Sequence, residues 1–270
     1  MLRVECPAKI NLTLEIVSKR ADGFHEIKSI MQTVSLCDIL SITLGDEGDT
    51  ITLSGTSEEI PYDERNLVHK ACRLFFDKLG KSFDVQVHIE KHIPVSAGLA
   101  GGSTDAAGML LGLNEALNQP LSKTELLELC AALGSDLNFC LEGGCKLATG
   151  RGEILEELPF KKFDLCIVKP KSLGISAKEA YQKYSELEVK PKLNMTEKFI
   201  SGDCTALHND LELGLDYPQL KALKEKVPNA VMSGSGSAFF VLGKDLLELG
   251  AEYEVFRNLK SVHFGARIIS

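Results

Sequence analysis

A cluster of glycines immediately ahead of a run of helix-forming residues constrains this chain more than any other feature. In PVSAGLAGGSTDAAGML, which spans residues 94–110, Gly98, Gly101 and Gly102 fall within five residues. A glycine in regular structure costs roughly 0.5–1 kcal/mol relative to alanine, so the cluster indicates a tight bend or a close approach by another group. The preceding FDVQVHIE alternates as a half-buried strand does. We therefore expect a strand, a glycine loop and then a helix N-terminus.

The predicted helix start has the properties of an anion site. Ser103 and Thr104 are expected to cap the helix, with Asp105 in its first turn. The N–H groups at a helix start lack partners within the helix, and the macrodipole adds about half a positive charge there. Phosphate fits such a site, with a tight connection that binds no ligand as an equal alternative on the glycines alone. The stretch is neither G-x-x-x-x-G-K-[ST] nor G-x-G-x-x-G, which argues against Walker-type and Rossmann-type sites.

Composition restricts the classes of partner. The 270 residues suffice for one large or two modest domains, and the formal charge of −8 argues against nucleic acid or an anionic membrane surface as a partner. No apolar run approaches the roughly 20 residues of a membrane-spanning helix, and the charged N-terminus is unlike a secretory signal. The eight cysteines lack metal-binding spacing and fall in apolar segments, which predicts buried, reduced thiols. We expect a cytoplasmic protein, whose oligomeric state the sequence leaves open.

The order of elements predicts an α+β fold with two domains, residues 1–155 and 156–270. Strands are expected in NLTLEIV, DILSITL, TITLSG and FDLCIVKP, and helices at 66–79, 122–133, from about 176 and near 217–227. Asn66 and Gly80 should cap the first of these helices, and Ser122 with Glu125 should form a capping box. A helical stretch after Gly243 and a last strand in HFGARII complete the pattern. A cleft between the domains is the natural place for a site.

Three further stretches carry chemical groups, and each also has an ordinary structural explanation. Lys9 and Asn11 in PAKINLTLEI would share one strand face, where a solvated surface is the alternative. Asp136 in LGSDLNF follows a predicted helix end, where polar turn residues are common. Gly234 and Gly236 interrupt an apolar strand in NAVMSGSGSAFF, which indicates either a close approach of backbone or ligand or a tight turn.

Taken in order along the chain, these stretches resemble the GHMP small-molecule kinases. The shared pattern is PAKINLTL, DGFHEI, PVSAGLAGGSTDAA, LGSDLNF and MSGSGSAFF, which together extend over almost the whole chain. PAKINL with DGFHEI is typical of the branch that uses ATP to phosphorylate the 2-hydroxyl of 4-diphosphocytidyl-2-C-methyl-D-erythritol, in the non-mevalonate pathway of isoprenoid precursor synthesis. The resemblance implies a two-domain GHMP kinase fold with the active site in the interdomain cleft. It also implies ATP as co-substrate and Mg²⁺ with the nucleotide, with no protein ligand assigned to the ion.

The resemblance further implies roles for individual residues. Lys9 and Asp136 match the catalytic pair, with Asp136 as the base toward the substrate hydroxyl, and Asn11 matches a residue beside the transferred phosphate. The positions that hold the cytosine ring are matched by Phe24, His25 and Tyr181. The adenine-side contacts are matched by Asn66, Leu67, Val68 and Lys91, and the triphosphate loop is matched by Gly98, Leu99, Ala100, Gly101, Gly102, Ser103 and Thr104. The ATP-binding positions also include Pro94, Val95, Ser96 and Ala97.

Two residues depart from the family pattern, and two alternative functions remain. Ala100 stands where glycine is usual, and Thr104 where serine is usual. Because a Cβ in the left-handed region costs about 1 kcal/mol or more, we expect a negative φ at Ala100. The alternatives are another GHMP enzyme, such as a mevalonate or homoserine kinase, and a non-catalytic nucleotide sensor. DGFHEI and Tyr181 argue against the first, and the presence of both Lys9 and Asp136 argues against the second.

Overall fold

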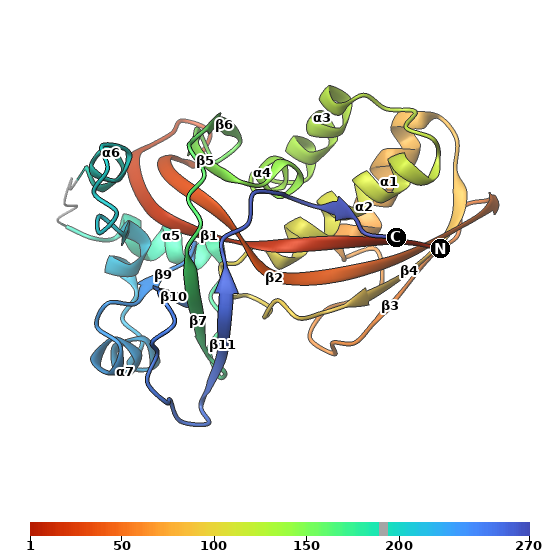
Figure 1. The fold of residues 1–270 in the computed structure, drawn as a ribbon. Coiled ribbons are helices and arrows are strands. Elements are labelled where there is room, and N and C mark those ends of the chain that lie inside the picture. The colour runs from red at the N-terminus through yellow and green to blue at the C-terminus, as the bar shows by residue number, and fades with distance from the viewer. Residues whose placement is uncertain (189–193) are drawn as a thin grey trace.

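Residues 1–188 and 194–270, which this computed structural model describes, form two β-sheets with helices on their outer faces (Figure 1). The first sheet has the order β12–β1–β2–β4–β3, with bounds Arg267–Ile268, Leu2–Lys19, His25–Glu47, Phe83–Glu90 and Ile51–Gly55. Three further strands extend this sheet: β5 (Cys145–Thr149) pairs with β2, β6 (Ile154–Glu157) pairs with β5, and β8 (His208–Asn209) pairs with β1. The second sheet has the order β11–β7–β10–β9, with bounds Tyr253–Lys260, Asp164–Pro170, Phe239–Leu242 and Val231–Met232.

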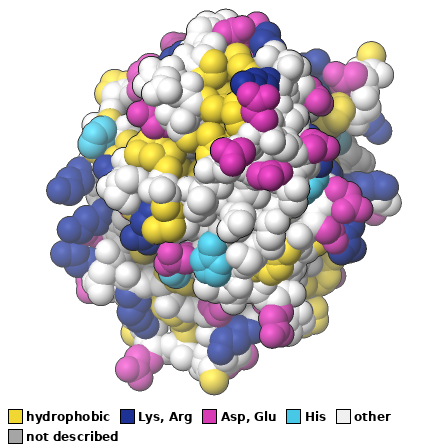
Figure 2. Space-filling view, turned by 90° about the vertical axis from the view of Figure 1, so that its right-hand side faces the viewer, with side chains coloured by type: hydrophobic (Ala, Val, Ile, Leu, Met, Phe, Trp, Pro, Cys, Tyr) yellow, Lys and Arg dark blue, Asp and Glu magenta, His cyan; other side chains and the backbone are white. Residues whose placement is uncertain are grey.

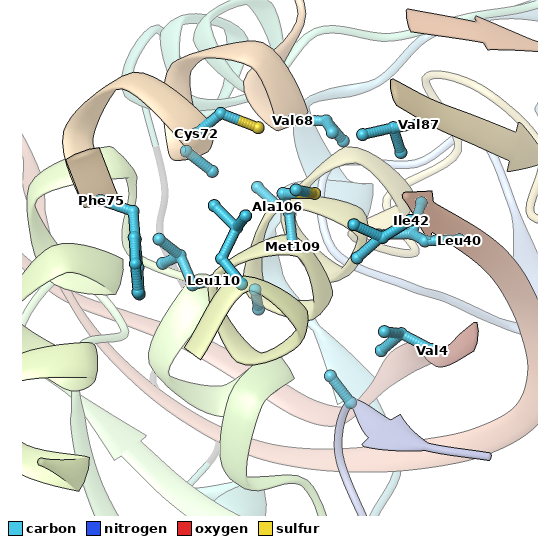
Figure 3. Packing of buried hydrophobic residues seen from close by; sticks show 14 of the residues in the cluster. Val4, Leu40, Ile42, Val68, Cys72, Phe75, Val87, Ala106, Met109 and Leu110 are labelled. Atoms are coloured by element: carbon cyan, nitrogen blue, oxygen red, sulfur yellow. The ribbon is translucent and has the colours of Figure 1, made fainter. Parts of the chain in front are cut away.

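Helices cover the outer face of each sheet. Those on the first sheet are α1 (Leu67–Leu79), α2 (Gly101–Ala116) and α3 (Lys123–Leu133), and those on the second are α5 (Ala177–Ser185) and α7 (Pro218–Lys226). Shorter elements are α4 (Leu137–Glu142), α6 (Met195–Ile200) and the 3₁₀ helix η1 (Asp210–Gly214). Figure 3 shows α2 in the centre of the first core, with Ala106 and Met109 between α1 and the strands. Burial of each large apolar side chain contributes about 1.5–3 kcal/mol, so this core fixes the position of the α2 N-terminus.

The two sheets face each other across a separate core. In β7, Leu165 and Ile167 belong to this core, whereas Cys166 and Val168 belong to the core shared with α5 and α7. A period of two with apolar residues on both sides is the pattern of a strand buried on both faces. The layers therefore follow the order helices, first sheet, second sheet, helices, and the predicted α+β class is confirmed.

The predicted helix caps are confirmed. Asn66 begins α1 by accepting the N–H of Val68 at 2.9 Å, and Gly80 ends it with a φ of 69°. Ser122 forms the capping box at the start of α3 with Glu125. Such caps satisfy N–H groups that lack partners and contribute about 0.5–2 kcal/mol each. Each cap joins near neighbours in the chain, which is why a short stretch of sequence is enough to predict it.

The prediction for the last part of the chain is wrong in one respect. Residues 244–250 form no helix, and Tyr253–Lys260 forms strand β11 instead. The partner of β11 is β7, with Val255 opposite Val168, so the new strand satisfies the backbone groups along one edge of β7. The predicted strand in HFGARII is reduced to β12, which pairs with Val4 and Glu5 of β1.

The chain passes between the two sheets more than once, which matters for the predicted division into domains. The boundary at 155/156 falls inside β6, and the chain later returns to the first sheet in β8 and β12. The first sheet is therefore not made from the first part of the chain alone. The division into residues 1–155 and 156–270 stays a prediction.

The surface and the cysteines complete the description. All eight cysteines are free; six are buried as predicted, Cys37 is half-buried, and Cys204 is exposed, against the prediction. Figure 2 views the molecule from the right of Figure 1 and shows acidic and basic side chains interspersed over that face. Among the described residues, no helix is both long enough and apolar enough to cross a membrane.

Candidate active site

The glycine loop turns sharply into α2. The helix begins at Gly101, two residues before the predicted caps, and its N-cap Ala100 makes no side-chain hydrogen bond. Ala100 has a φ of 58°, so the expectation of a negative φ is wrong. The left-handed conformation costs about 1 kcal/mol for alanine, and contact of Ala100 with the first core offsets part of that cost. The early start places Asp105 one turn inside α2, where it is 2% exposed, rather than in the first turn.

The loop touches the turn between β9 and β10 through glycines. A Cβ built on Gly98 would lie 2.0 Å from the carbonyl oxygen of Ser233. A Cβ on Gly234 would lie 2.7 Å from the oxygen of Gly98 and 2.8 Å from Nζ of Lys9. No side chain fits in either place, so the close approach predicted at Gly234 is confirmed. It brings backbone from the second sheet against the glycine loop.

Lys9 and Asn11 lie together in the interior of β1. Register shifts between Pro7 and Lys9 and between Asn11 and Thr13 bend the strand on either side of the pair. The Lys9 ammonium donates to Oδ1 of Asn11 at 2.7 Å and to the carbonyl oxygen of Gly98 at 2.9 Å. Lys9 is 3% exposed. Within the described residues its hydrogen-bond partners are neutral oxygens, and it forms no ion pair.

Asp136 lies at the N-terminus of α4 and faces a cavity of about 720 Å³. Lys9 and Asn11 line the same cavity. Across residues 1–188 and 194–270, the Asp136 carboxylate makes neither a hydrogen bond nor an ion pair. Burial raises the pKa of the Tyr181 phenol above its usual value, and the negative charge of Asp136 raises it further. A carboxylate without a partner among the described residues, in the same cavity as a buried lysine, suits proton removal from a hydroxyl.

Aromatic residues from distant parts of the chain meet in this cavity. Phe24 lies in the β1–β2 turn and His25 begins β2, and both line the cavity with Tyr181 of α5. The imidazole of His25 stacks on Tyr181 with centroids 5.1 Å apart. Its Nε2 also lies 3.0 Å from the Ser185 hydroxyl. The Arg151 guanidinium lies over the Phe24 ring, 4.9 Å from its centroid. The fold thus brings the three predicted cytosine-binding residues together.

One face of α5 lines the cavity along its whole length. The residues concerned are Ala177, Lys178, Tyr181, Gln182 and Ser185. Their spacing of three and four residues is that of a single helix face. Of this set the sequence predicted only Tyr181, although the helical spacing is visible in SAKEAYQKYS. Lys19 and Arg151 also line the cavity and were not predicted.

A second cavity of about 530 Å³ adjoins the first. The two share Gly98, Ala100, Ser103, Ala177 and Ser235 in their walls. The predicted nucleotide-binding residues that line the second cavity are Asn66, Leu67, Lys91 and residues 94–103. Val68 and Thr104 do not line it; they are buried, at 1% and 0% exposed. Residues missed by the sequence include Ile60, Pro61, Arg65, Ile175 and Ser176.

Comparisons with known proteins agree with this geometry. Residues 66–144 match the family described as the GHMP kinases N terminal domain. The chain is 38% identical to the 4-diphosphocytidyl-2-C-methyl-D-erythritol kinase of Syntrophomonas wolfei over 86% of each chain. It is 36% identical to that of Thermoanaerobacter pseudethanolicus, over 99% of this chain and 96% of the relative. A crystal structure of 4-(cytidine 5'-diphospho)-2C-methyl-D-erythritol kinase superimposes with a TM-score of 0.79 at 28% identity, covering 96% of this chain and 99% of the other.

Proposed function

Because the chain belongs to the 4-diphosphocytidyl-2-C-methyl-D-erythritol kinase family of GHMP kinases, we propose that its two cavities hold the two substrates of that reaction. The enzyme is an ATP-dependent kinase of the non-mevalonate pathway. ATP occupies the cavity along the glycine loop, and the cytidylated acceptor occupies the cavity of Lys9 and Asp136. The observation that carries this assignment is that the cavities meet at Gly98, whose carbonyl oxygen binds Lys9 at 2.9 Å.

The start of α2 supplies the site for the triphosphate. The first N–H groups of the helix have no partners within it, and the helix dipole adds positive potential at the same place. Gly101 and Gly102 begin α2 and line the nucleotide cavity. Phosphoryl transfer depends mainly on positioning and on stabilising charge. Fixed backbone donors meet that requirement, because they need no rearrangement when ATP binds.

Lys9 and Asp136 act on the transferred group. Asp136 accepts the proton of the 2-hydroxyl as that oxygen bonds to the terminal phosphorus of ATP, and the bond from that phosphorus to the bridging oxygen breaks to release ADP. The Lys9 ammonium donates to the neutral oxygens of Asn11 and Gly98 and pairs with no carboxylate of the described residues. It stabilises the negative charge that develops between the hydroxyl and the phosphate. Asn11 fixes the direction of the ammonium, and Asn11 is itself fixed by the Ser29 hydroxyl at 2.8 Å.

The remaining part of the acceptor extends along α5. Its cytosine lies among Phe24, His25 and Tyr181, where stacked rings contribute about 0.5–1.5 kcal/mol beyond buried area. Its diphosphate passes Lys19 and Lys178, two exposed lysines in the cavity wall that form no ion pair with described residues. These cations give the cavity a local positive charge within a chain of net charge −8.

Magnesium and location complete the proposal. No group of three or more His, Cys, Asp or Glu side chains in the described part of the chain could hold a metal ion. We therefore expect Mg²⁺ to arrive on the ATP phosphates with water in its other positions, and we assign no step to it. The reaction is placed in the cytoplasm, where the eight free cysteines would stay reduced.

A coupled assay of ADP release tests the proposed function. The full chain is incubated with ATP and one of three acceptors: the cytidylated alcohol, mevalonate or homoserine. Turnover is expected with the cytidylated alcohol alone. Comparable turnover of mevalonate or homoserine would assign the chain to another GHMP activity. ATP binding without ADP release from any acceptor would favour a nucleotide sensor.

A further inference from the structure

A buried cluster of charged side chains lies directly behind the glycine loop. The Lys91 ammonium contacts Asp38 and lies 2.8 Å from Oδ2 of Asp105. Lys91, Asp38 and Asp105 have side chains that are 5%, 0% and 3% exposed. A buried charge without a partner costs several kcal/mol. Each of these three buried groups is therefore stabilised by the other two.

The cluster connects the two ends of the loop. Lys91 follows β4 immediately, and Asp105 is one turn inside α2, so their contact closes the chain segment that contains the whole loop. Asp38 anchors this pair to β2. Its Oδ1 also accepts the N–H groups of His92 and Ile93 at 2.6 and 2.8 Å. Both strands and the helix are thereby held at fixed distances.

The loop needs such an external constraint. Ser96 and Ala100 have φ values of 52° and 58°, a conformation that side chains with a Cβ disfavour. Each such residue costs of order 1–3 kcal/mol and persists only where the surroundings impose it. The two residues flank Gly98, whose carbonyl oxygen binds Lys9. Relaxation of either residue would therefore move the backbone that both cavities share.

From this geometry we propose that the Lys91 ammonium positions the glycine loop through Asp38 and Asp105, in addition to the adenine-side contact that the resemblance implies for this residue of the cavity wall. The proposal rests on the proposed function for its ligand, the triphosphate of ATP. Two of the three N–H donors of the ammonium are directed to carboxylates. A Cβ built on Gly101 would lie 2.9 Å from Nζ, so the ammonium lies against the first residue of α2. Lys91 acts on ATP through the shape of the loop.

Burial and the neighbouring charges shift the pKa values of Asp105 and Lys91. The pKa of Asp105 is raised to about 8, mainly by burial. The positive charge of Lys91 lowers this pKa, and the negative charge of Asp38 raises it. Burial lowers the pKa of Lys91, but the two carboxylates outweigh it, so the net shift is upward. Burial raises the pKa of the Cys6 and Cys140 thiols, and the charge of Asp105 raises both further.

The variant Lys91→Met tests the clasp, because it removes the charge and keeps a long unbranched side chain. Lys146→Met is the matched control. Lys146 is 7% exposed, contacts Glu142 and Glu157, and lines neither cavity. Titration calorimetry gives the Kd of each protein for ATP, for inorganic tripolyphosphate and for the cytidylated acceptor. Binding is measured without turnover, so the result stands whether or not the acceptor is phosphorylated.

Lys91→Met is expected to raise the Kd values for ATP and for tripolyphosphate by the same factor, about 10- to 100-fold, because both ligands bind to the loop. Acceptor affinity and all affinities of Lys146→Met should stay within about twofold of wild type. Unchanged ATP affinity would overturn the proposal. So would a loss for ATP without a loss for tripolyphosphate, since that pattern indicates an adenine contact. If Lys91→Met does not fold, Lys91→Met with Asp105→Leu takes its place, since apolar replacement of a buried ion pair is often tolerated.

Discussion

The two halves of the cleft recognise their ligands by different parts of the chain. The nucleotide half is built largely on one continuous stretch, residues 94–103, with further wall residues such as Asn66 and Ser176 from other elements, and buried charges fix the stretch from behind. The acceptor half is assembled from the β1–β2 turn, the start of α4 and one face of α5, and its Phe24 is 52% exposed. The first half therefore depends on backbone conformation and the second on side-chain identity. We therefore propose that ATP, a substrate of many kinases, is held mainly by backbone groups and that the cytidylated acceptor is held mainly by side chains.

The largest effect is expected at the junction of the halves. Asp136→Asn removes the base and leaves its volume unchanged, so kcat should fall by roughly 10²–10⁴, the usual scale for general-base catalysis. Steady-state ADP release measures kcat, and calorimetry should show both substrates binding as in wild type. Turnover within a few-fold of wild type would remove Asp136 from the role of base.

A change to the loop should affect the nucleotide half alone. Gly101→Val places a side chain where even a Cβ would lie 2.9 Å from the Lys91 ammonium. ATP affinity should fall about 10- to 100-fold, because a displaced loop misplaces its N–H donors. The Kd for the cytidylated acceptor, measured on the same sample, is the control. Equal loss of both ligands would mean that the two halves are not separable.

A change of acceptor base should affect the other half alone. We expect the uridine analogue to lose about 5- to 100-fold in kcat/KM, since a wrong base leaves a buried polar group unsatisfied at a cost of about 1–3 kcal/mol. His25, whose Nε2 lies 3.0 Å from the Ser185 hydroxyl, is the candidate for reading the amino-pyrimidine edge. Equal kcat/KM for the two acceptors would exclude base recognition by His25.

Removal of an aromatic ring should have a smaller effect. Phe24→Ala and Tyr181→Ala are each expected to raise the acceptor KM about 2- to 10-fold, the scale of one stacking contact. The KM for ATP should stay near the wild-type value. Phe160→Ala is the matched control, because Phe160 is 38% exposed and lines neither cavity. A comparable rise in the ATP KM would contradict the separation of the halves.

The smallest effect concerns pH and the buried cluster. The pKa of Asp105 is raised in the folded protein to about 8. The stability that its bound proton contributes is complete below the unfolded pKa of about 4 and is lost as the pH rises through the folded value. Asparagine does not titrate at this position, so Asp105→Asn does not share the loss of stability that wild type undergoes as the pH rises. The Tm of the variant minus that of wild type should therefore increase by a few degrees between pH 5 and pH 9. Calorimetric scans at several pH values measure it, and a constant difference would show that Asp105 does not titrate there.

The nucleotide half was largely predictable because its determinants are local. The strand, the glycine cluster and the helix are consecutive, and the Asn66 cap involves a residue two positions away. Its errors have physical causes. The helix begins at Gly101 because Ala100 takes a positive φ, which alanine disfavours and which surrounding contacts impose. The Asp38–Lys91 contact spans 53 residues and has no local signature in the sequence.

The acceptor half was predicted only through family resemblance. The stacking of His25 on Tyr181 depends on α5 lying against the β1–β2 turn, and the spacing of SAKEAYQKYS alone does not give that arrangement. The same reason explains the error at β11. The segment after Gly243 has helical residues, but the free edge of β7 selects a strand there. A tertiary contact overrides a local preference in both places.

The face of α5 has a consequence for the size of molecule that this cleft accepts. Ala177 is shared with the nucleotide cavity, and Ser185 lies beside His25 at the opposite end of the helix. At about 1.5 Å per residue, these positions are about 12 Å apart along the axis. The face of the helix therefore favours an acceptor long enough to extend along it. In the proposed binding mode, a polyol phosphate without the cytidylyl group lacks the part that would contact the aromatic residues at the Ser185 end of the helix. We therefore expect such short molecules to bind weakly whatever their hydroxyl group offers.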